Sequence, residues 1–179
     1  MEFELLGWPA DGPTLRLDHE QFAYAGKFAM SATGKAVVRD GETTVAAVAF
    51  NADRTDERVL WLRYVTVRRD RRGEGITPAL VAFVRDQACD RGYDRVRIAV
   101  NNPYAFEALY RAGFGFTGET TGIAELVLEH PRPTDAESAY RTGLETFTGR
   151  DLTAEERSFV DARLQRGPPA VTDDASEES

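Results

Sequence analysis

The sequence is poor in several residue types, and each shortage narrows the possible functions. The 179 residues include a single cysteine, Cys89, so no disulfide can form within the chain, and we expect a cytoplasmic protein. The two histidines, His19 and His130, are far apart and unsupported by other ligands, so no metal site is expected. No apolar run approaches the roughly 20 residues that span a bilayer. The start Met1-Glu2-Phe3-Glu4 lacks the basic residues of a signal peptide, so we expect neither secretion nor membrane insertion.

Positive charge is also scarce. Thirty acidic residues against 22 basic ones give a formal net charge of −8, which opposes binding to nucleic acid and to anionic membranes. Lys27 and Lys35 are the only lysines. Such an acidic, lysine-poor composition resembles that of proteins from high-salt cytoplasms, although a GC-rich genome also replaces lysine with arginine. With 42% hydrophobic and 29% charged residues, the chain otherwise has the composition of one globular domain with an appendage.

A β-hairpin and a long strand are predicted in the first half. Two β-rich stretches, 35–39 and 43–50, flank Asp40-Gly41, a dipeptide that favours a tight hairpin turn. Residues 58–67 form the longest β-like run and are predicted to be a central strand. Alternation along it predicts one shared face for Trp61, Arg63, Val65 and Val67.

The central strand leads through glycines into a helix. Pro78 lies near the first helical position and Gly92 is the expected stop. Its apolar stripe is predicted to contain Leu80, Phe83, Val84 and Ala88. Cys89 falls near this stripe, so we expect a buried small residue in preference to a nucleophile.

Further elements are predicted on both sides of this core. Upstream we expect a strand near Phe3 and a helix over 18–30. Downstream we expect a strand over 94–100, a helix over 103–112, and closing strands over 113–117 and 123–129. The sequence thus predicts an α/β (α+β) fold.

The character of the sequence changes at Pro131 and Pro133. Two amphipathic helices are predicted over 135–147 and 154–165, the second with a capping box formed by Thr153 and Glu156. We therefore predict a domain over 1–130, a helical appendage over 131–167 and an acidic, disordered tail over 168–179. The helices are expected to pack on their own domain, contact a partner or form a homodimer.

The loop Arg72-Gly73-Glu74-Gly75-Ile76-Thr77 carries the strongest functional signal. Glycines between a strand and a helix let successive backbone N–H groups converge, and the helix N-terminus adds partial positive charge, an arrangement that binds phosphate. Neither a Walker loop nor a dinucleotide fingerprint fits, because the Lys-Ser/Thr pair and the third glycine are missing. A solvated basic turn or a site for another anion, such as a nucleotide phosphate, are the alternatives.

The loop resembles the CoA loop of the GNAT superfamily of N-acetyltransferases. The family pattern Arg/Gln-x-x-Gly-x-Gly/Ala matches Arg72 and Gly75, whereas Thr77 replaces the final small residue. Asn102, Ala105 and Gly113-Phe114 reproduce a second, later pattern of the family. The resemblance implies a mixed, mostly antiparallel central sheet flanked by helices. It also implies that acetyl-CoA is the acetyl donor and is bound by Val65, Val67, Arg71, Arg72, Gly73, Glu74, Gly75, Ile76, Thr77 and Asn102.

The resemblance implies a different role in cofactor binding for each group of these residues. The backbone of Val65 and Val67 would hold the pantetheine arm, and Arg71 and Arg72 would neutralise the diphosphate, with Arg68 or Arg69 as further candidates. The Glu74 side chain would have to point away from the diphosphate.

The catalytic residues are less well defined than the cofactor loop. The family's general acid is commonly a tyrosine seven residues after the asparagine; Tyr110 comes eight residues after Asn102. Tyr110 is therefore a candidate acid or a packing residue, with Tyr104 and Tyr64 as substitutes. The central strand contains no carboxylate, so Glu57, Glu119 and Glu125 remain open as the general base.

Two functions follow from the resemblance. The first is an N-acetyltransferase that moves the acetyl group of acetyl-CoA to an amine of a small molecule or protein by direct attack in a ternary complex. The alternative is a non-catalytic CoA-binding regulatory or interaction module. The amine acceptor is not identified by the sequence.

Overall fold

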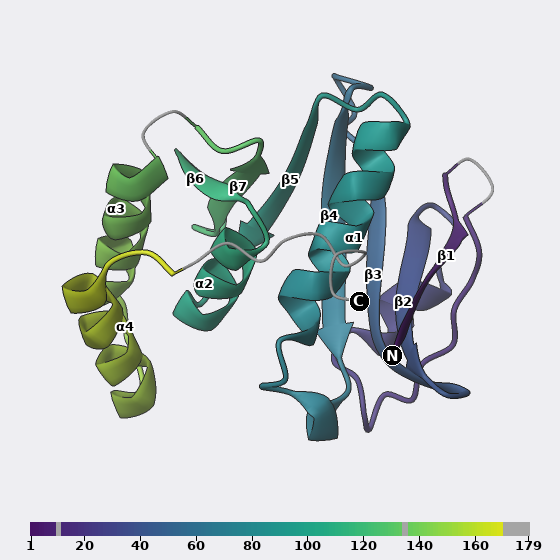
Figure 1. The fold of residues 1–179 in the computed structure, drawn as a ribbon, viewed down its shortest axis with the longest axis horizontal. Coiled ribbons are helices and arrows are strands. Elements are labelled where there is room, and N and C mark those ends of the chain that lie inside the picture. The colour runs from purple at the N-terminus through teal and green to yellow at the C-terminus, as the bar shows by residue number, and fades with distance from the viewer. Residues whose placement is uncertain (10–11, 134–135, 170–179) are drawn as a thin grey trace. The chain divides into compact units, whose positions relative to one another are not determined.

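The computed structural model describes residues 1–9, 12–133 and 136–169, which fold into two compact units, Met1–Val96 and the described residues from Arg97 on (Figure 1). Residues 170–179 of the predicted tail lie outside the described residues. So does Asp135, the predicted first residue of a helix. The domain boundaries at 130 and 167 stay predictions.

The first unit contains an antiparallel sheet. Its strands are β1 (Glu2–Gly7), β2 (Gly34–Asp40), β3 (Thr43–Ala52) and β4 (Val59–Val67), paired in that order. The predicted hairpin is confirmed, and Gly41 adopts the left-handed conformation at its turn, with φ of 64°. The strand expected near Phe3 and the central strand are confirmed as β1 and β4.

A bulge in β4 overturns the predicted face of that strand. Ala49 pairs with Tyr64 but Phe50 pairs with Leu62, so Arg63 is an extra residue against β3. A bulge shifts the alternation by one residue. Trp61 therefore shares its face with Tyr64, whereas Val65 and Val67 share theirs with Leu62, and the prediction of one common face was wrong.

One face of this sheet is covered by α1 (Ile76–Asp90), which follows β4 through the short 3-10 helix η2 (Arg69–Arg71). Figure 1 shows α1 running beside β3 and β4. Phe83 of α1 stacks on Phe3 of β1 with ring centroids 5.5 Å apart. Gly92, the predicted stop, lies just beyond the helix with φ of 87°. The predicted strand-to-helix passage is confirmed.

The opposite face is covered by the segment between β1 and β2. Here the predicted helix over 18–30 was wrong, because this segment contains turns and the short 3-10 helix η1 (Ala25–Ala29). Asp18 accepts from Glu20 N–H through its side chain, a turn that competes with helix formation. Tyr24 then takes a left-handed φ of 60°. Phe28 is fully buried against Val37, Ala47 and Ala49.

The second unit begins within β5 (Arg95–Val100) and continues through α2 (Pro103–Arg111), β6 (Gly115–Thr120) and β7 (Leu126–His130). Two C-terminal helices follow, α3 (Ala136–Thr148) and α4 (Ala154–Arg166). Strands β6 and β7 are antiparallel. The strands and four helices described confirm the predicted α/β class with a mostly antiparallel sheet. No described helix has the length and apolar character that a membrane crossing requires.

The C-terminal helices pack within this second unit. The Phe106 ring of α2 contacts Tyr140 and Phe147 of α3, with centroids 5.6 and 5.9 Å away. A Cβ on Gly143 of α3 would lie 2.4 Å from Phe106, so only glycine allows this close approach. In α4, Phe159 lies against Tyr104 with ring centroids 4.6 Å apart. Packing on their own unit, one of the three expectations for these helices, is thus observed.

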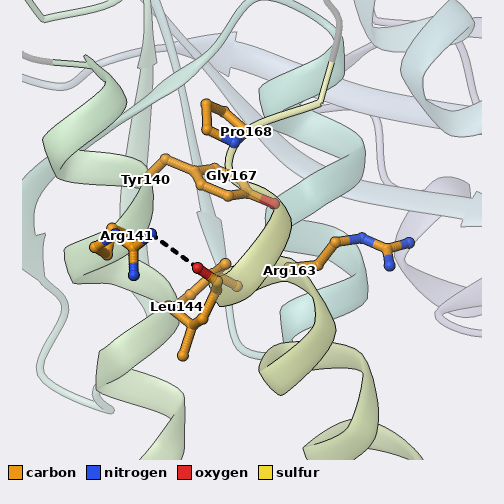
Figure 2. A pocket seen from close by; sticks show the side chains of 7 residues that line it. Tyr140, Arg141, Leu144, Arg163, Gly167 and Pro168 are labelled. Carbon is orange, nitrogen blue, oxygen red and sulfur yellow. Dashed lines mark hydrogen bonds between the residues drawn. The ribbon is translucent and has the colours of Figure 1, made fainter.

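A small cavity of about 30 Å³ lies between α3 and α4 (Figure 2). Its lining includes Tyr140, Leu144 and Pro168, and Arg141 donates to the Leu164 carbonyl at 2.8 Å beside it. The Tyr140 hydroxyl is buried with no hydrogen-bond partner among the described residues. The volume is that of about one water molecule, so the cavity is too small for an organic ligand.

Candidate functional site

The glycine loop between β4 and α1 has the geometry of an anion-binding nest. Gly73 and Gly75 have φ of 86° and 76°, in the left-handed region that favours glycine. Gly75 is the N-cap of α1, and no described side chain caps this helix start. The first N–H groups of the helix therefore have no side-chain acceptor, and the helix dipole favours an anion there.

Several charged side chains around the loop form ion pairs with one another. Arg71 donates from Nε to Glu74 Oε2 at 2.9 Å and from Nη1 to Asp40 at 3.0 Å. These hydrogen bonds raise the pKa of Arg71 further. Glu74 is thus held in an ion pair with Arg71. This pairing offsets the negative charge of the Glu74 carboxylate, which would otherwise oppose the binding of an anion to the loop. Arg72 is exposed, and its side chain forms no hydrogen bond or ion pair with any described residue.

The neighbouring arginines also contact the surrounding chain. Arg68 lies 3.0 Å from Asp70 in an ion pair, and Arg69 donates from Nε to the Glu20 carbonyl at 3.1 Å. Val65 and Val67 are half-buried in β4, opposite Val48 and Ala46 of β3. Among the arginines predicted to neutralise the diphosphate, Arg72 is the one least engaged with protein groups.

In the second unit, the predicted Asn102 caps α2. Its Oδ1 accepts from Ala105 N–H at 2.9 Å, and Pro103 occupies the first helical position. Gly113, with φ of 97°, follows the helix end. The spacing of Asn102, Ala105 and Gly113 therefore has a local cause, since these residues begin and end one helix. A cofactor-binding role for Asn102 stays a prediction.

Tyr110, the predicted general acid, is packed inside the second unit. It is 5% exposed. Its ring meets Tyr140 edge-on with centroids 4.7 Å apart, and the Arg132 guanidinium lies 3.7 Å from its centroid. Burial lowers the pKa of Arg132, which also donates to the Phe114 carbonyl at 3.1 Å. The packing contacts are observed, while the catalytic role stays a prediction.

The candidate bases lie in different settings. Glu57 and Glu119 are exposed, and Glu119 lies 3.9 Å from Arg97. Glu125 accepts from the Thr121 hydroxyl at 3.4 Å. None of the three is buried, so burial does not distinguish one of them as the base.

Cys89 differs from its prediction because it is exposed. Ala88 occupies the buried stripe of α1, and the next residue is rotated by about 100° around the helix axis. Partial burial and the nearby Asp86 raise the pKa of the Cys89 thiol, which disfavours the thiolate that a nucleophile requires.

A polar cluster on the β3–β4 hairpin was missed by sequence reasoning. Trp61 Nε1 donates to Asp53 Oδ1 at 2.7 Å, and Arg63 Nε donates to Asn51 Oδ1 at 2.6 Å. Hydrogen bonds from Thr55, and then from Trp61, lower the pKa of Asp53 to about 2. Prediction of this cluster would require the register of β3 and β4, which pairs Asn51 with Trp61 and which no local sequence signal defines.

Comparison with known proteins identifies the family. A model described as the acetyltransferase (GNAT) family matches residues 3–116, more than half of the chain. The chain belongs to the GNAT acetyltransferase family. No curated protein matches the sequence.

Solved structures of several acetyltransferases are similar to this chain. An acetyltransferase from Bacillus subtilis, solved with CoA, has 13% identity and a TM-score of 0.54, and the alignment covers 71% of this chain and 95% of that one. Nourseothricin acetyltransferase has 23% identity and a TM-score of 0.49 over 56% of this chain. The PaiA N-acetyltransferase from Thermoplasma acidophilum, solved with coenzyme A, has 15% identity and a TM-score of 0.46 over 53% of this chain. The chain spans 66% and 58% of these last two structures, less than two thirds of each.

Proposed function

We propose that this GNAT-family chain binds acetyl-CoA at the loop 72–77 and transfers the acetyl group to an amine. The observation that carries the proposal is the start of α1, which has two left-handed glycines and no side-chain cap among the described residues. Such a start offers N–H groups and a favourable dipole to a diphosphate. The family match supports the same activity.

The residues of the loop fit a diphosphate. Gly73, Gly75, Ile76 and Thr77 would donate backbone N–H groups, and the exposed Arg72 would supply a mobile cation. Arg71 would act less as a direct ligand than as the partner that holds the Glu74 carboxylate aside. The backbone of Val65 and Val67 and the Asn102 side chain complete the proposed contacts.

Acetyl-CoA supplies an acetyl group activated as a thioester. For direct attack in a ternary complex, the protein must bind the acceptor with its amine neutral, because an unperturbed alkylamine of pKa about 10.4 is mostly protonated at neutral pH. The chain must therefore provide or connect to a proton acceptor. Tyr110 is the candidate that returns a proton to the CoA sulfur.

The first experiment tests the loop. Gly75→Asp places a carboxylate in the proposed nest, so we expect acetyl-CoA affinity to fall at least a hundredfold in calorimetric titrations at low and at molar KCl. Gly92→Asp is the matched control, because Gly92 has a similar φ of 87° and lies at the other end of the same helix. Equal affinity of wild type and Gly75→Asp would contradict the loop assignment.

The second experiment tests the candidate acid. If the Tyr110 phenol protonates the thiolate, Tyr110→Phe should lower kcat about a hundredfold and leave the Kd for acetyl-CoA unchanged. Steady-state rates with an amine panel and calorimetry give the two quantities. An unchanged kcat would leave Tyr110 only its packing contacts with Tyr140 and Arg132.

A non-catalytic CoA-binding module is the second candidate. The burial of Tyr110 between Arg132 and Tyr140 favours it, because a packed phenol is a poor proton donor to a bound ligand. CoA release from acetyl-CoA in the presence of the amine panel separates the two functions. Amine-dependent release supports the enzyme, and saturable binding without release supports the module.

A further inference from the structure

Arg63 is held in one orientation on the surface of the first unit. The bulge in β4 makes it an extra residue, and bulges often redirect a side chain next to a functional site. Its Nε donates to Asn51 Oδ1 at 2.6 Å, and its guanidinium lies 5.3 Å from the centre of the Trp61 ring. Two contacts from different strands thus fix the group.

Arg63 is an exposed residue, although burial of part of its side chain lowers the pKa of the guanidinium. Arg63 forms no ion pair with any described residue, although the chain has eight more acidic than basic residues. The nearby Asp53 accepts from Trp61 through Oδ1 and from Thr55 through Oδ2, and its charge attracts Arg63 without forming an ion pair. Other arginines of this unit, such as Arg58 and Arg71, have carboxylate partners. An oriented arginine without such a partner is suited to a carboxylate from outside the chain.

The position of Arg63 relates it to the proposed cofactor strand. It lies two residues before Val65 in β4, and its contacts Asn51 and Trp61 are on the sheet face opposite α1. On the same face Tyr64 lies near Tyr24, with ring centroids 5.8 Å apart, and Tyr24 is 57% exposed. Tyr24 and Arg63 are both exposed, so an acceptor bound beside them would meet an aromatic residue and an oriented cation.

We infer that Arg63 binds a carboxylate of the amine acceptor, so that the substrate class is an amine that carries a carboxylate, such as an amino acid. The inference rests on the proposed function, because the bound carboxylate belongs to an acetyl acceptor only if the chain is an acetyltransferase. Asn51 and Trp61 are positioning residues, which hold the guanidinium so that both Nη groups face the carboxylate. Bidentate pairing would discriminate against the uncharged amide of the same acceptor.

The test measures binding without turnover. The wild-type chain is titrated with N-acetyl-L-amino acids, which are product analogues, and with the corresponding N-acetyl-L-amino-acid amides, with and without CoA. The NMR signal of the Arg63 Nε–H, assigned by its loss in Arg63→Gln, reports contact directly. We expect this signal to shift with the carboxylates, and we expect their Kd to be at least tenfold lower than that of the amides.

Two variants make the result specific. Arg63→Gln should abolish the preference for carboxylate over amide, whereas Arg157→Gln should preserve it. Arg157 is an exposed residue of α4, and its substitution makes the same change in net charge. No Arg63 shift with any carboxylate, equal affinities for acid and amide, or equal effects of the two variants would each overturn the inference.

Calorimetry with CoA separates this inference from the proposed function. Arg63→Gln should bind CoA with wild-type affinity, because Arg63 is not part of the loop 72–77. Failure of the wild type to bind CoA would contradict the proposed function, while the Arg63 signal in the titrations without CoA would still decide whether this residue recognises carboxylates.

Discussion

Tyr140 shows how a single buried hydroxyl couples stability to pH. The residue is 1% exposed, and its hydroxyl has no hydrogen-bond partner among the described residues. Burial, followed by the nearby Glu107, raises the pKa of Tyr140 to about 12. An unfolded tyrosine has a pKa of about 10. Between these values the unfolded chain loses this proton and the folded chain keeps it, so the free energy of unfolding falls as pH rises.

We therefore predict that Tyr140→Phe removes part of the alkaline destabilisation. A difference of two pKa units corresponds to about 2.7 kcal/mol. This is the largest decrease in the free energy of unfolding that Tyr140 can cause in the wild type between pH 10 and pH 12, and the variant lacks it. At pH 8 the two proteins should agree within about 1 kcal/mol, because the hydroxyl has no described partner to lose. Urea unfolding at pH 8 and at pH 11 gives both differences, and parallel loss of stability in the two proteins would refute the prediction.

The burial of some single residues could not be predicted from the sequence. Lys35 begins a predicted strand, yet it is 0% exposed, and its Nζ donates to the carbonyls of Met30 and Thr33 at 2.7 and 2.9 Å. Burial lowers the pKa of Lys35. The acceptors come from the loop before β2, whose path a strand pattern does not define. For the same reason the exposure of Cys89 was mispredicted, since it depends on a rotation of one residue around α1.

Elements were predicted well where local chemistry determines them. The Asp40-Gly41 hairpin and the Thr153–Glu156 capping box are both present, because each depends on residues within a few positions. The bulge at Arg63 depends on tertiary contacts, and the path of residues 18–30 depends on such contacts as well as on the local turn at Asp18. Phe28, for example, is buried against β2 and β3. The loop 72–77 was found because its glycines are a local signal, whereas the Arg63 cluster needs the register of two strands.

The capping box yields a prediction for α4. Thr153 Oγ1 accepts from Glu156 N–H at 3.1 Å, and Glu156 Oε1 accepts from Thr153 N–H at 3.0 Å. Val160 is the one fully buried residue among those described in α4, so the helix depends strongly on its cap. Thr153→Ala should lower the free energy of unfolding by about 1 kcal/mol in urea titrations. Thr153→Ser retains the hydroxyl and should stay close to wild type; an equal loss in both variants would rule out the cap as the cause.

At the scale of the whole molecule, the excess of negative charge is the main electrostatic feature. Thirty acidic and 22 basic residues leave a net charge of −8. Several acids are paired, as Asp94 is with Arg58 and Asp40 with Arg71, but exposed pairs contribute little. The remaining acids repel one another, and this repulsion opposes the compact state. Salt at about 1 M shortens the screening length to about 3 Å, which weakens both the pairs and the repulsion.

Because the acidic residues outnumber the basic residues, screening should stabilise the folded chain. We predict that the Tm in scanning calorimetry at pH 7 rises by several degrees between about 0.05 M and about 1 M KCl. The same comparison near pH 5 is the control, because the sequence pI is about 4.9 and the net repulsion there is close to zero. A Tm that falls with KCl at pH 7 would mean that ion pairs outweigh the repulsion. An equal rise at both pH values would point to a general salt effect on burial, which does not depend on charge.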